Sequence, residues 1–179
     1  MQIRMATQAD VSQILDIYDA AHDFMRRTGN PTQWPEGYPS REDVEGDLAR
    51  DVLYVCVAES VVLAAFLFAP GPDPTYAEID GAWLNDEPYH VVHRIAAREG
   101  SHAGRTCLAW ACEQVRNLRI DTHEDNAPMR RTLSRLGFVE CGIIICDNGT
   151  PRVAYQHVRP EDDVTSYTST CRPGMVWLR

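Results

Sequence analysis

The order in which two kinds of apolar periodicity follow one another constrains this chain more than any other feature of its sequence. Apolar residues recur at three- and four-residue steps over residues 11–25, which predicts a helix with one buried face. Two apolar runs follow, 52–58 and 61–69, and only Glu59 and Ser60 separate them, which predicts an antiparallel hairpin. Strand and helix patterns alternate only in the second half. The order β-α-α-β-β-β-β-α-β-α-β-β therefore predicts an α+β fold.

The remaining segments complete this pattern. Gly29-Asn30-Pro31 ends the first helix, and Ser40 is a suitable cap for a second helix that reaches about residue 50. Turn residues bound the other predicted elements, which are a first strand over 2–6, strands over 75–84, 90–97, 118–122, 139–146 and 152–157, and helices over 105–117 and 126–136. We therefore expect a central mixed, mostly antiparallel sheet of about six to seven strands, flanked by about four helices.

The size of the chain indicates a single domain. Its 179 residues, of which 44 % are hydrophobic, are enough to bury a core without disulfides or metal ions. No low-complexity tract or repeat marks a boundary before residue 160. The segment 161–179 is polar and shows no periodicity apart from Met175–Leu178. We expect one domain over residues 1–160, followed by a C-terminal tail.

Charge and cysteine usage exclude several classes of protein. A net charge of −9 argues against a non-specific nucleic-acid binder, which needs a basic face. No apolar run approaches the roughly 20 residues of a membrane span, and no charged stretch followed by an apolar core suggests a signal peptide. The six cysteines show no CxxC spacing. We expect reduced thiols, no metal ion, no membrane contact and a cytoplasmic location.

A set of short segments, rather than a single motif, points to a reaction. In the N-terminal half these are Ile3-Arg4-Met5-Ala6-Thr7 and Asp10. In the C-terminal half they are His93-Arg94-Ile95-Ala96, Gly104, Arg119-Ile120-Asp121-Thr122-His123, Asn126 and Leu136-Gly137-Phe138. In this order and spacing, over roughly residues 2–158, they resemble the GNAT superfamily of acyl-CoA-dependent acyltransferases. A bacterial branch of that superfamily is similar in further segments, namely Gln33-Trp34, Tyr38-Pro39, Cys141-Gly142-Ile143-Ile144, Arg152 and Ala154-Tyr155.

The resemblance implies a site for acetyl-CoA in the second half of the chain. Family members bind the pantetheine arm through backbone groups of the strand that corresponds to residues 94–96. They bind the pyrophosphate at the N-terminus of the next helix, where free N–H groups and the helix dipole favour anions. Asn126 matches a family asparagine that contacts the CoA arm, and it is also a suitable helix cap. The expected acetyl-CoA-binding residues are Arg94, Ile95, Ala96, His102, Ala103, Gly104, Arg105, Thr106, Asn126 and Met129.

The sequence departs from the family pattern in the phosphate loop and in a later helix. In the loop pattern Arg/Gln-x-x-Gly-x-Gly/Ala, the second glycine is present as Gly104, the first is replaced by His102, and the basic residue falls on Glu99 or Gly100. Leu133 stands where many relatives have a tyrosine that protonates the leaving thiolate. A thiol with a pKa of about 8.5 is a fair leaving group near neutral pH even without an acid. The alternative proton donors are Tyr155, Cys141 and His123.

Acetyl transfer to an amine also needs a base that removes a proton from the ammonium group. Glu78 and Asp80 fall on the strand where family members often have a base, and strand alternation predicts that they share one face. By the same rule Asp121 and His123 share a face of a later strand, where a carboxylate and an imidazole together would form a base. The alternative is that they only cap the following turn. We interpret His93, in an apolar strand, as a hydrogen-bonded core residue.

Aromatic residues are the candidates for the acceptor side. In the family the acceptor pocket lies between the first two helices and the last hairpin. Aromatic rings there can stack on a substrate or contact a cation, although each one alone could be simple packing. The four candidates are Trp34, Tyr38, Trp83 and Tyr89. The predicted function is transfer of an acetyl group from acetyl-CoA to a primary amine of a small molecule or peptide, whose identity the sequence does not indicate.

Two other functions stay open at this level. The altered phosphate loop and the missing tyrosine favour a non-catalytic GNAT-fold module that binds an acyl-CoA or acts in regulation. A cysteine hydrolase would use Cys141 or Cys112 with His123, but no local signature places a base beside either thiol. Because GNAT relatives are often dimers, the resemblance also suggests a homodimer, with Trp177 of the tail as a contact.

Overall fold

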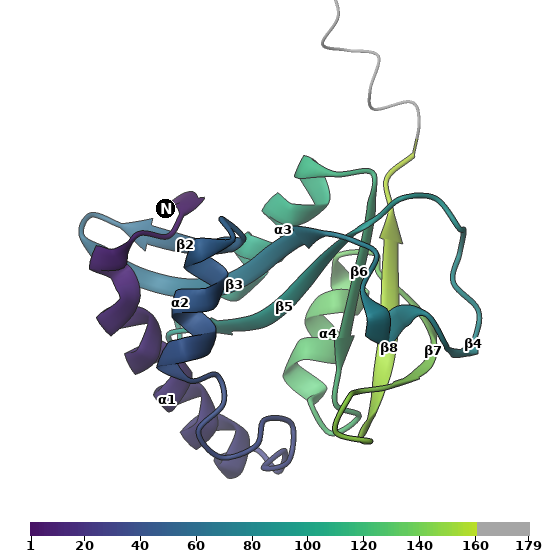
Figure 1. Ribbon diagram of the computed structural model, residues 1–179, viewed down its shortest axis with the longest axis horizontal. Coiled ribbons are helices and arrows are strands. Elements are labelled where there is room, and N and C mark those ends of the chain that lie inside the picture. Colours follow the sequence, from purple (N-terminus) through teal and green to yellow (C-terminus); the bar gives the residue numbers. More distant parts are fainter. Residues whose placement is uncertain (161–179) are drawn as a thin grey trace, which may run out of the picture.

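The computed structural model describes residues 1–160, whose strands form one mixed sheet (Figure 1). The strands are β1 (Gln2–Met5), β2 (Leu53–Ala58), β3 (Val61–Pro70), β4 (Asp80–Gly81), β5 (His90–Ala97), β6 (Asn117–Thr122), β7 (Val139–Ile145) and β8 (Pro151–Val158). They lie in the order β1-β2-β3-β5-β6-β8-β7-β4. Among these strands only β5 and β6 pair in parallel. The predicted mixed, mostly antiparallel sheet is confirmed, and the eighth strand is the two-residue β4.

Within residues 1–160, four α-helices accompany the sheet, as predicted. They are α1 (Val11–Arg27), α2 (Arg41–Ala49), α3 (Ala103–Gln114) and α4 (Ala127–Arg135). The predicted caps of two of them are present: the Ser40 hydroxyl accepts a hydrogen bond from the Asp43 N–H at 3.1 Å, and Asn126 Oδ1 accepts one from the Met129 N–H at 3.2 Å. No helix within residues 1–160 is long and apolar enough to cross a membrane.

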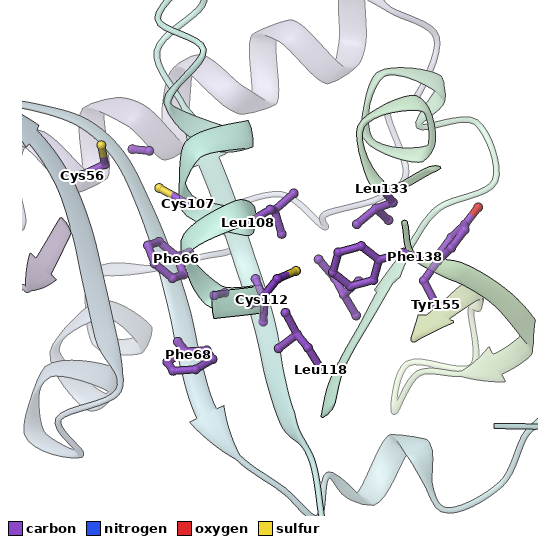
Figure 2. Close-up of a cluster of buried hydrophobic side chains, with 14 of the residues drawn as sticks. Cys56, Phe66, Phe68, Cys107, Leu108, Cys112, Leu118, Leu133, Phe138 and Tyr155 are labelled. Atoms are coloured by element: carbon purple, nitrogen blue, oxygen red, sulfur yellow. The ribbon is translucent and has the colours of Figure 1, made fainter. Parts of the chain in front are cut away.

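The helices cover opposite faces of the sheet (Figure 1). Helices α1 and α2 pack on β2, β3 and β5 through buried residues such as Ile14, Val44 and Val55. On the other face, α3 and α4 cover a larger cluster, which Figure 2 shows around Leu108, Leu118 and Phe138. Alternate residues of the strands contribute to the two layers, because successive side chains of a strand point to opposite faces.

The parallel strands β5 and β6 separate soon after they begin (Figure 1). Their pairing consists of His90 with Leu118 and Val91 with Arg119. Beyond this point β5 contains a bulge: Leu67 of β3 pairs with His93, whereas Ala65 pairs with Ala96, so two residues of β5 oppose one of β3. Arg94, inside the bulge, has φ of 50°. The separation opens the middle of the sheet between its two halves.

The predicted strand over 75–84 is wrong. Asp73 caps a 3₁₀ turn, Pro74–Tyr76, by accepting a hydrogen bond from the Thr75 N–H at 2.9 Å. The chain forms a strand again only at β4, which pairs with β7. Glu78 therefore lies outside any strand and does not share a strand face with Asp80. The predicted tail 161–179, and with it Trp177, lies outside the described residues.

Candidate active site

Two cavities meet where β5 and β6 separate. One, of about 550 Å³, lies beside the start of α3, and we call it the α3 cavity. The other, of about 680 Å³, contains His93 in its wall, and we call it the His93 cavity. Both are lined by Gln33, Trp34, Ile95 and Met129. The two cavities are therefore adjacent, and a group held in one can reach a group held in the other.

Most of the residues expected to bind acetyl-CoA line the α3 cavity. These are Ile95, Ala96, His102, Gly104, Arg105, Asn126 and Met129. Ala103 and Thr106 lie in the first turn of α3 without lining the cavity, and Arg94 lines the His93 cavity instead. Seven of the ten residues that the resemblance suggested for acetyl-CoA thus line one cavity, because the segment from β5 to α3 is continuous in the chain.

The start of α3 combines a tight loop with close packing against β5. His102, the residue before α3, adopts the left-handed conformation with φ of 57°. A Cβ atom placed on Gly104 would lie 3.6 Å from the Cβ of Ala97, an ordinary contact. An alanine therefore fits at position 104, whereas a larger side chain would extend into the cavity that Gly104 lines. The first N–H groups of the helix and its dipole favour an anion here.

Ionisable groups cluster around His93 in the wall of its cavity. His93 Nε2 lies 2.8 Å from Asp73 Oδ2, and His93 Nδ1 lies 3.7 Å from Asp121 Oδ1. The hydroxyl of buried Tyr76 donates to Asp121 Oδ1 at 2.7 Å. The imidazole thus has a carboxylate near each ring nitrogen. The hydrogen bond with Asp73 orients the ring, and an imidazole lining a cavity can exchange a proton with a ligand there.

Asp73 stays ionised because its hydrogen bonds outweigh its burial. Burial alone would raise the pKa of this carboxyl, but hydrogen bonds from His93 and Thr75 lower the pKa to about 2. Burial and the neighbouring Asp121 carboxylate raise the pKa of Tyr76 well above its usual range, so Tyr76 stays a hydrogen-bond donor. These charges make His93 a candidate base, although its sequence context suggested a core residue.

Two of the four aromatic candidates for the acceptor side lie in the His93 cavity. Trp34 and Tyr38 line it, and the Tyr38 hydroxyl accepts a hydrogen bond from Arg94 Nη1 at 3.0 Å. Trp83 and Tyr89 line neither cavity. Their rings lie 4.0 Å and 3.9 Å from the guanidinium of Arg119 and enclose it as a cation–π sandwich. Structural packing therefore accounts for these two rings.

The other predicted acid–base residues lie apart from the cavities. Glu78 and Asp80 are exposed, and neither lines a cavity. His123 follows the last residue of β6, so it does not share a strand face with Asp121, and the predicted pairing of these two is wrong. His123 Nδ1 instead accepts a hydrogen bond from the Asp125 N–H at 3.2 Å. This bond supports the alternative that His123 caps the turn.

Tyr155 is engaged away from both cavities. Its hydroxyl accepts a hydrogen bond from Arg130 Nε at 3.0 Å and donates one to Glu140 Oε2 at 3.0 Å. Figure 2 shows the ring at the border of the buried cluster with its oxygen directed away from Leu108. Leu133, at the position of the family's tyrosine, is fully buried in the same cluster. Neither residue lines the α3 cavity.

The thiols considered for a cysteine hydrolase are not activated. Burial raises the pKa of Cys112 to about 12 and also raises the pKa of Cys141. Within residues 1–160 neither thiol has a hydrogen bond to His123. The five cysteines of this part of the chain are free thiols, and they do not form a metal-binding cluster there. The arrangement does not favour nucleophilic catalysis by cysteine.

Sequence reasoning gave no role to Asp73, Tyr76, Gln33 or Arg152. Gln33 Oε1 accepts a hydrogen bond from Asn126 Nδ2 at 2.7 Å, and its backbone oxygen accepts one from Arg152 Nη2 at 2.7 Å. Gln33 and Arg152 belong to the segments shared with the bacterial GNAT branch, which was the available signal. The sequence contained no signal for Asp73 or Tyr76, because Asp73 lies in a segment interpreted as a break between strands and Tyr76 in a segment interpreted as a strand.

The structure is similar to solved acetyltransferases. A GNAT-family acetyltransferase from Streptococcus agalactiae is 30 % identical, with a TM-score of 0.81, and the match covers 89 % of this chain and 96 % of that one. A GNAT acetyltransferase from Listeria monocytogenes (19 % identity, TM-score 0.66, 88 % and 94 % covered) shares the fold. A ribosomal-protein-alanine N-acetyltransferase from Brucella melitensis shares it as well, with 22 % identity and a TM-score of 0.63, and that match covers 89 % of this chain and 100 % of the other.

Sequence comparisons alone do not identify the chain. No family model matches it, and no curated protein matches it. The similarity in structure extends over nearly the whole length of the Streptococcus agalactiae protein and is accompanied by 30 % identity. The separated parallel strands, the bulge in β5 and the cavity at the start of α3 lie where the sequence resemblance expected the acyl-CoA site. The chain belongs to the GNAT family of acetyltransferases.

Proposed function

We propose that this protein transfers an acetyl group from acetyl-CoA to a primary amine, with acetyl-CoA in the α3 cavity and the amine in the His93 cavity. The observation that carries the proposal is the junction of the two cavities at Ile95 and Met129. One cavity offers a helix N-terminus, which suits the pyrophosphate of CoA. The other offers an imidazole beside two carboxylates, which suits an ammonium group.

The reaction needs a proton acceptor on the amine side. His93 takes a proton from the ammonium, and the ionised Asp73 and the adjacent Asp121 stabilise the resulting imidazolium. The free amine attacks the thioester carbonyl, forming the C–N bond. The C–S bond then breaks, and the electron pair leaves with the CoA thiolate. Water protonates the thiolate, because neither Leu133 nor Tyr155 supplies an acid to the α3 cavity.

Calorimetric titration with acetyl-CoA tests the position of the cofactor. We expect micromolar affinity for the wild type and for Gly104→Ala, because the added Cβ makes only an ordinary contact with Ala97. Gly104→Leu fills part of the α3 cavity and should weaken binding by about 10- to 100-fold. Gly104→Ala is the matched control for the loss of the glycine itself. Equal affinity for all three proteins, or no binding to the wild type, would refute this placement.

Acetyl transfer is then measured as release of the CoA thiol with a broad panel of amines. The alternative function is a non-catalytic GNAT-fold module that binds acyl-CoA. Its support is Leu133, which replaces the family's tyrosine and lies in the buried cluster. Binding of acetyl-CoA without turnover of any amine would favour the module. Turnover that is lost in Gly104→Leu and kept in Gly104→Ala would favour the enzyme.

A further inference from the structure

Arg152 is a buried cation in the wall of the His93 cavity. It lies on β8 and is 5 % exposed. Its Nη1 donates to Thr150 Oγ1 and to the Pro151 carbonyl, both at 2.9 Å, and its Nη2 donates to the Gln33 carbonyl at 2.7 Å. All three acceptors are neutral oxygens. Two of the five N–H donors of the guanidinium, one on Nε and one on Nη2, have no acceptor among residues 1–160.

The charge of Arg152 is not compensated as are the charges of the half-buried Arg94 and the equally buried Arg119. Arg94 forms an ion pair with Asp47, and Arg119 lies between the rings of Trp83 and Tyr89. Within residues 1–160, Arg152 has neither a carboxylate within 4.0 Å nor an aromatic ring over its guanidinium. Burial of a cation without a counter-charge is costly. A ligand anion in the cavity would supply the missing partner.

The sheet places Arg152 on the same face as the proposed base. Asp121 of β6 pairs with Ala154 of β8, and Arg152 lies two residues before Ala154. Residues two apart on a strand share a face, so Arg152 and Asp121 are diagonal neighbours, with Cα atoms about 7–8 Å apart. Asp121 adjoins His93. One face of the sheet thus offers a site for an ammonium group and, beside it, a site for an anion.

We propose that the acceptor is an amine that also carries a carboxylate, as an amino acid does, and that Arg152 binds this carboxylate while His93 and Asp121 receive the ammonium. This inference rests on the proposed function and names the substrate class of the same site. The planar guanidinium matches the two oxygens of a carboxylate. The carboxamide of the same amine cannot provide the charge that Arg152 lacks. Arg152 is therefore a specificity-determining residue that discriminates acids from amides.

The first experiment compares acids with amides on the wild-type protein. The probes are the twenty L-amino acids, β-alanine and γ-aminobutyrate, each with its carboxamide, and binding is measured by calorimetry without acetyl-CoA. We expect one or more acids to bind, each about 100-fold more tightly than its amide. Amides that bind as tightly as the acids, or a panel in which no acid binds, would overturn the inference.

The same panel separates this inference from the proposed function. If acids bind but are not acetylated, the result supports a carboxylate site at Arg152 and argues against acetyl transfer to these acids. If amides are acetylated as efficiently as the acids, the result supports acetyl transfer and overturns the proposed role of Arg152. A separate calorimetric titration with acetyl-CoA shows, whatever the outcome of the panel, whether the protein binds the cofactor.

The second experiment removes the charge. Arg152→Gln should reduce the affinity for the acids about 100-fold and leave the affinity for the amides unchanged. Arg119→Gln is the matched control, because Arg119 is equally buried at 5 % exposure but lines neither cavity. It should retain the preference for acids. An unchanged preference in folded Arg152→Gln would overturn the inference, and if that variant does not fold, the wild-type comparison of acids with amides decides.

Discussion

The α3 cavity and the His93 cavity share four lining residues, yet they are built in different ways. The wall of the α3 cavity comes mainly from α1, the end of β5 and the starts of α3 and α4. The His93 cavity is lined by charged side chains from separate loops and strands, among them Asp73, Arg94, Asp121 and Arg152. Backbone geometry determines the first cavity, and long-range packing of side chains determines the second.

This difference explains why a cofactor can be common to a family while the acceptor varies. A helix N-terminus binds phosphate through backbone N–H groups, which any non-proline residue supplies. His102 in place of the family's glycine therefore leaves the donors of α3 present. The His93 cavity does not tolerate substitution in the same way, because its charges belong to individual side chains. Replacing one side chain there changes which ligands are favourable.

The largest expected effect tests whether catalysis depends on the His93 cavity while binding of acetyl-CoA depends on the α3 cavity. His93→Gln removes the proposed base, and we expect kcat to fall about 1000-fold. Affinity for acetyl-CoA should stay within about twofold, because His93 does not line the α3 cavity. Steady-state kinetics with an accepted amine and calorimetry with acetyl-CoA measure the two quantities. Glu78→Gln is the control, since Glu78 is exposed outside both cavities.

Two results would break this separation. If His93→Gln also loses affinity for acetyl-CoA, the cavities do not function independently. If it keeps the wild-type kcat while Glu78→Gln loses it, the base lies on the segment 74–81 and not on β5.

A second prediction uses pH to measure the charge of the His93 cavity. The pKa of Asp73 is lowered from its usual 3.8 to about 2, so its ionised form stabilises the folded protein above pH 4. This contribution, about 2 kcal/mol, should be lost as the pH falls from about 4 to about 2. Denaturant unfolding of the wild type and Asp73→Asn at several pH values measures it. We expect the difference between the two proteins to shrink toward pH 2, and a constant difference would contradict the assignment.

The smallest predicted effect concerns a residue outside both cavities. Tyr155→Phe removes the hydroxyl that links Arg130 to Glu140, which should cost about 1 kcal/mol of stability. Neither kcat nor the affinity for acetyl-CoA should change by more than about twofold. Thermal unfolding and the same kinetic assays test this. A fall in kcat with normal stability would instead assign Tyr155 a part in proton transfer.

Local sequence patterns were sufficient for most of the fold. Helical periodicity over 11–25, the cap at Ser40 and the cap at Asn126 depend on neighbouring residues, and all three are confirmed. The segment 75–84 was misassigned because its residues suit a strand, whereas Asp73 and Pro74 favour a 3₁₀ turn. Local propensity did not decide between these two structures.

The His93 cavity was harder to predict because it depends on register. The bulge at Arg94 interrupts the alternation of β5, so His93 and its neighbour Arg94 line the same cavity. A rule that assigns alternate residues to opposite faces cannot anticipate this. Asp73 and Asp121 are 48 residues apart in the chain, and the pairing of β5 with β6 is what places Asp121 beside His93. No short motif contains all three residues.

Hydrogen bonds of Gln33 connect the two cavities in which we propose that acetyl-CoA and the acceptor bind. Its side chain accepts a hydrogen bond from Asn126, at the α3 cavity, and its backbone oxygen accepts one from Arg152, at the His93 cavity. If a ligand in one cavity displaces Gln33, the hydrogen bonds of the other cavity change with it, and the two ligands bind cooperatively. Linkage makes such cooperativity reciprocal: the factor by which bound acetyl-CoA changes the affinity for the acceptor equals the factor by which the acceptor changes the affinity for acetyl-CoA.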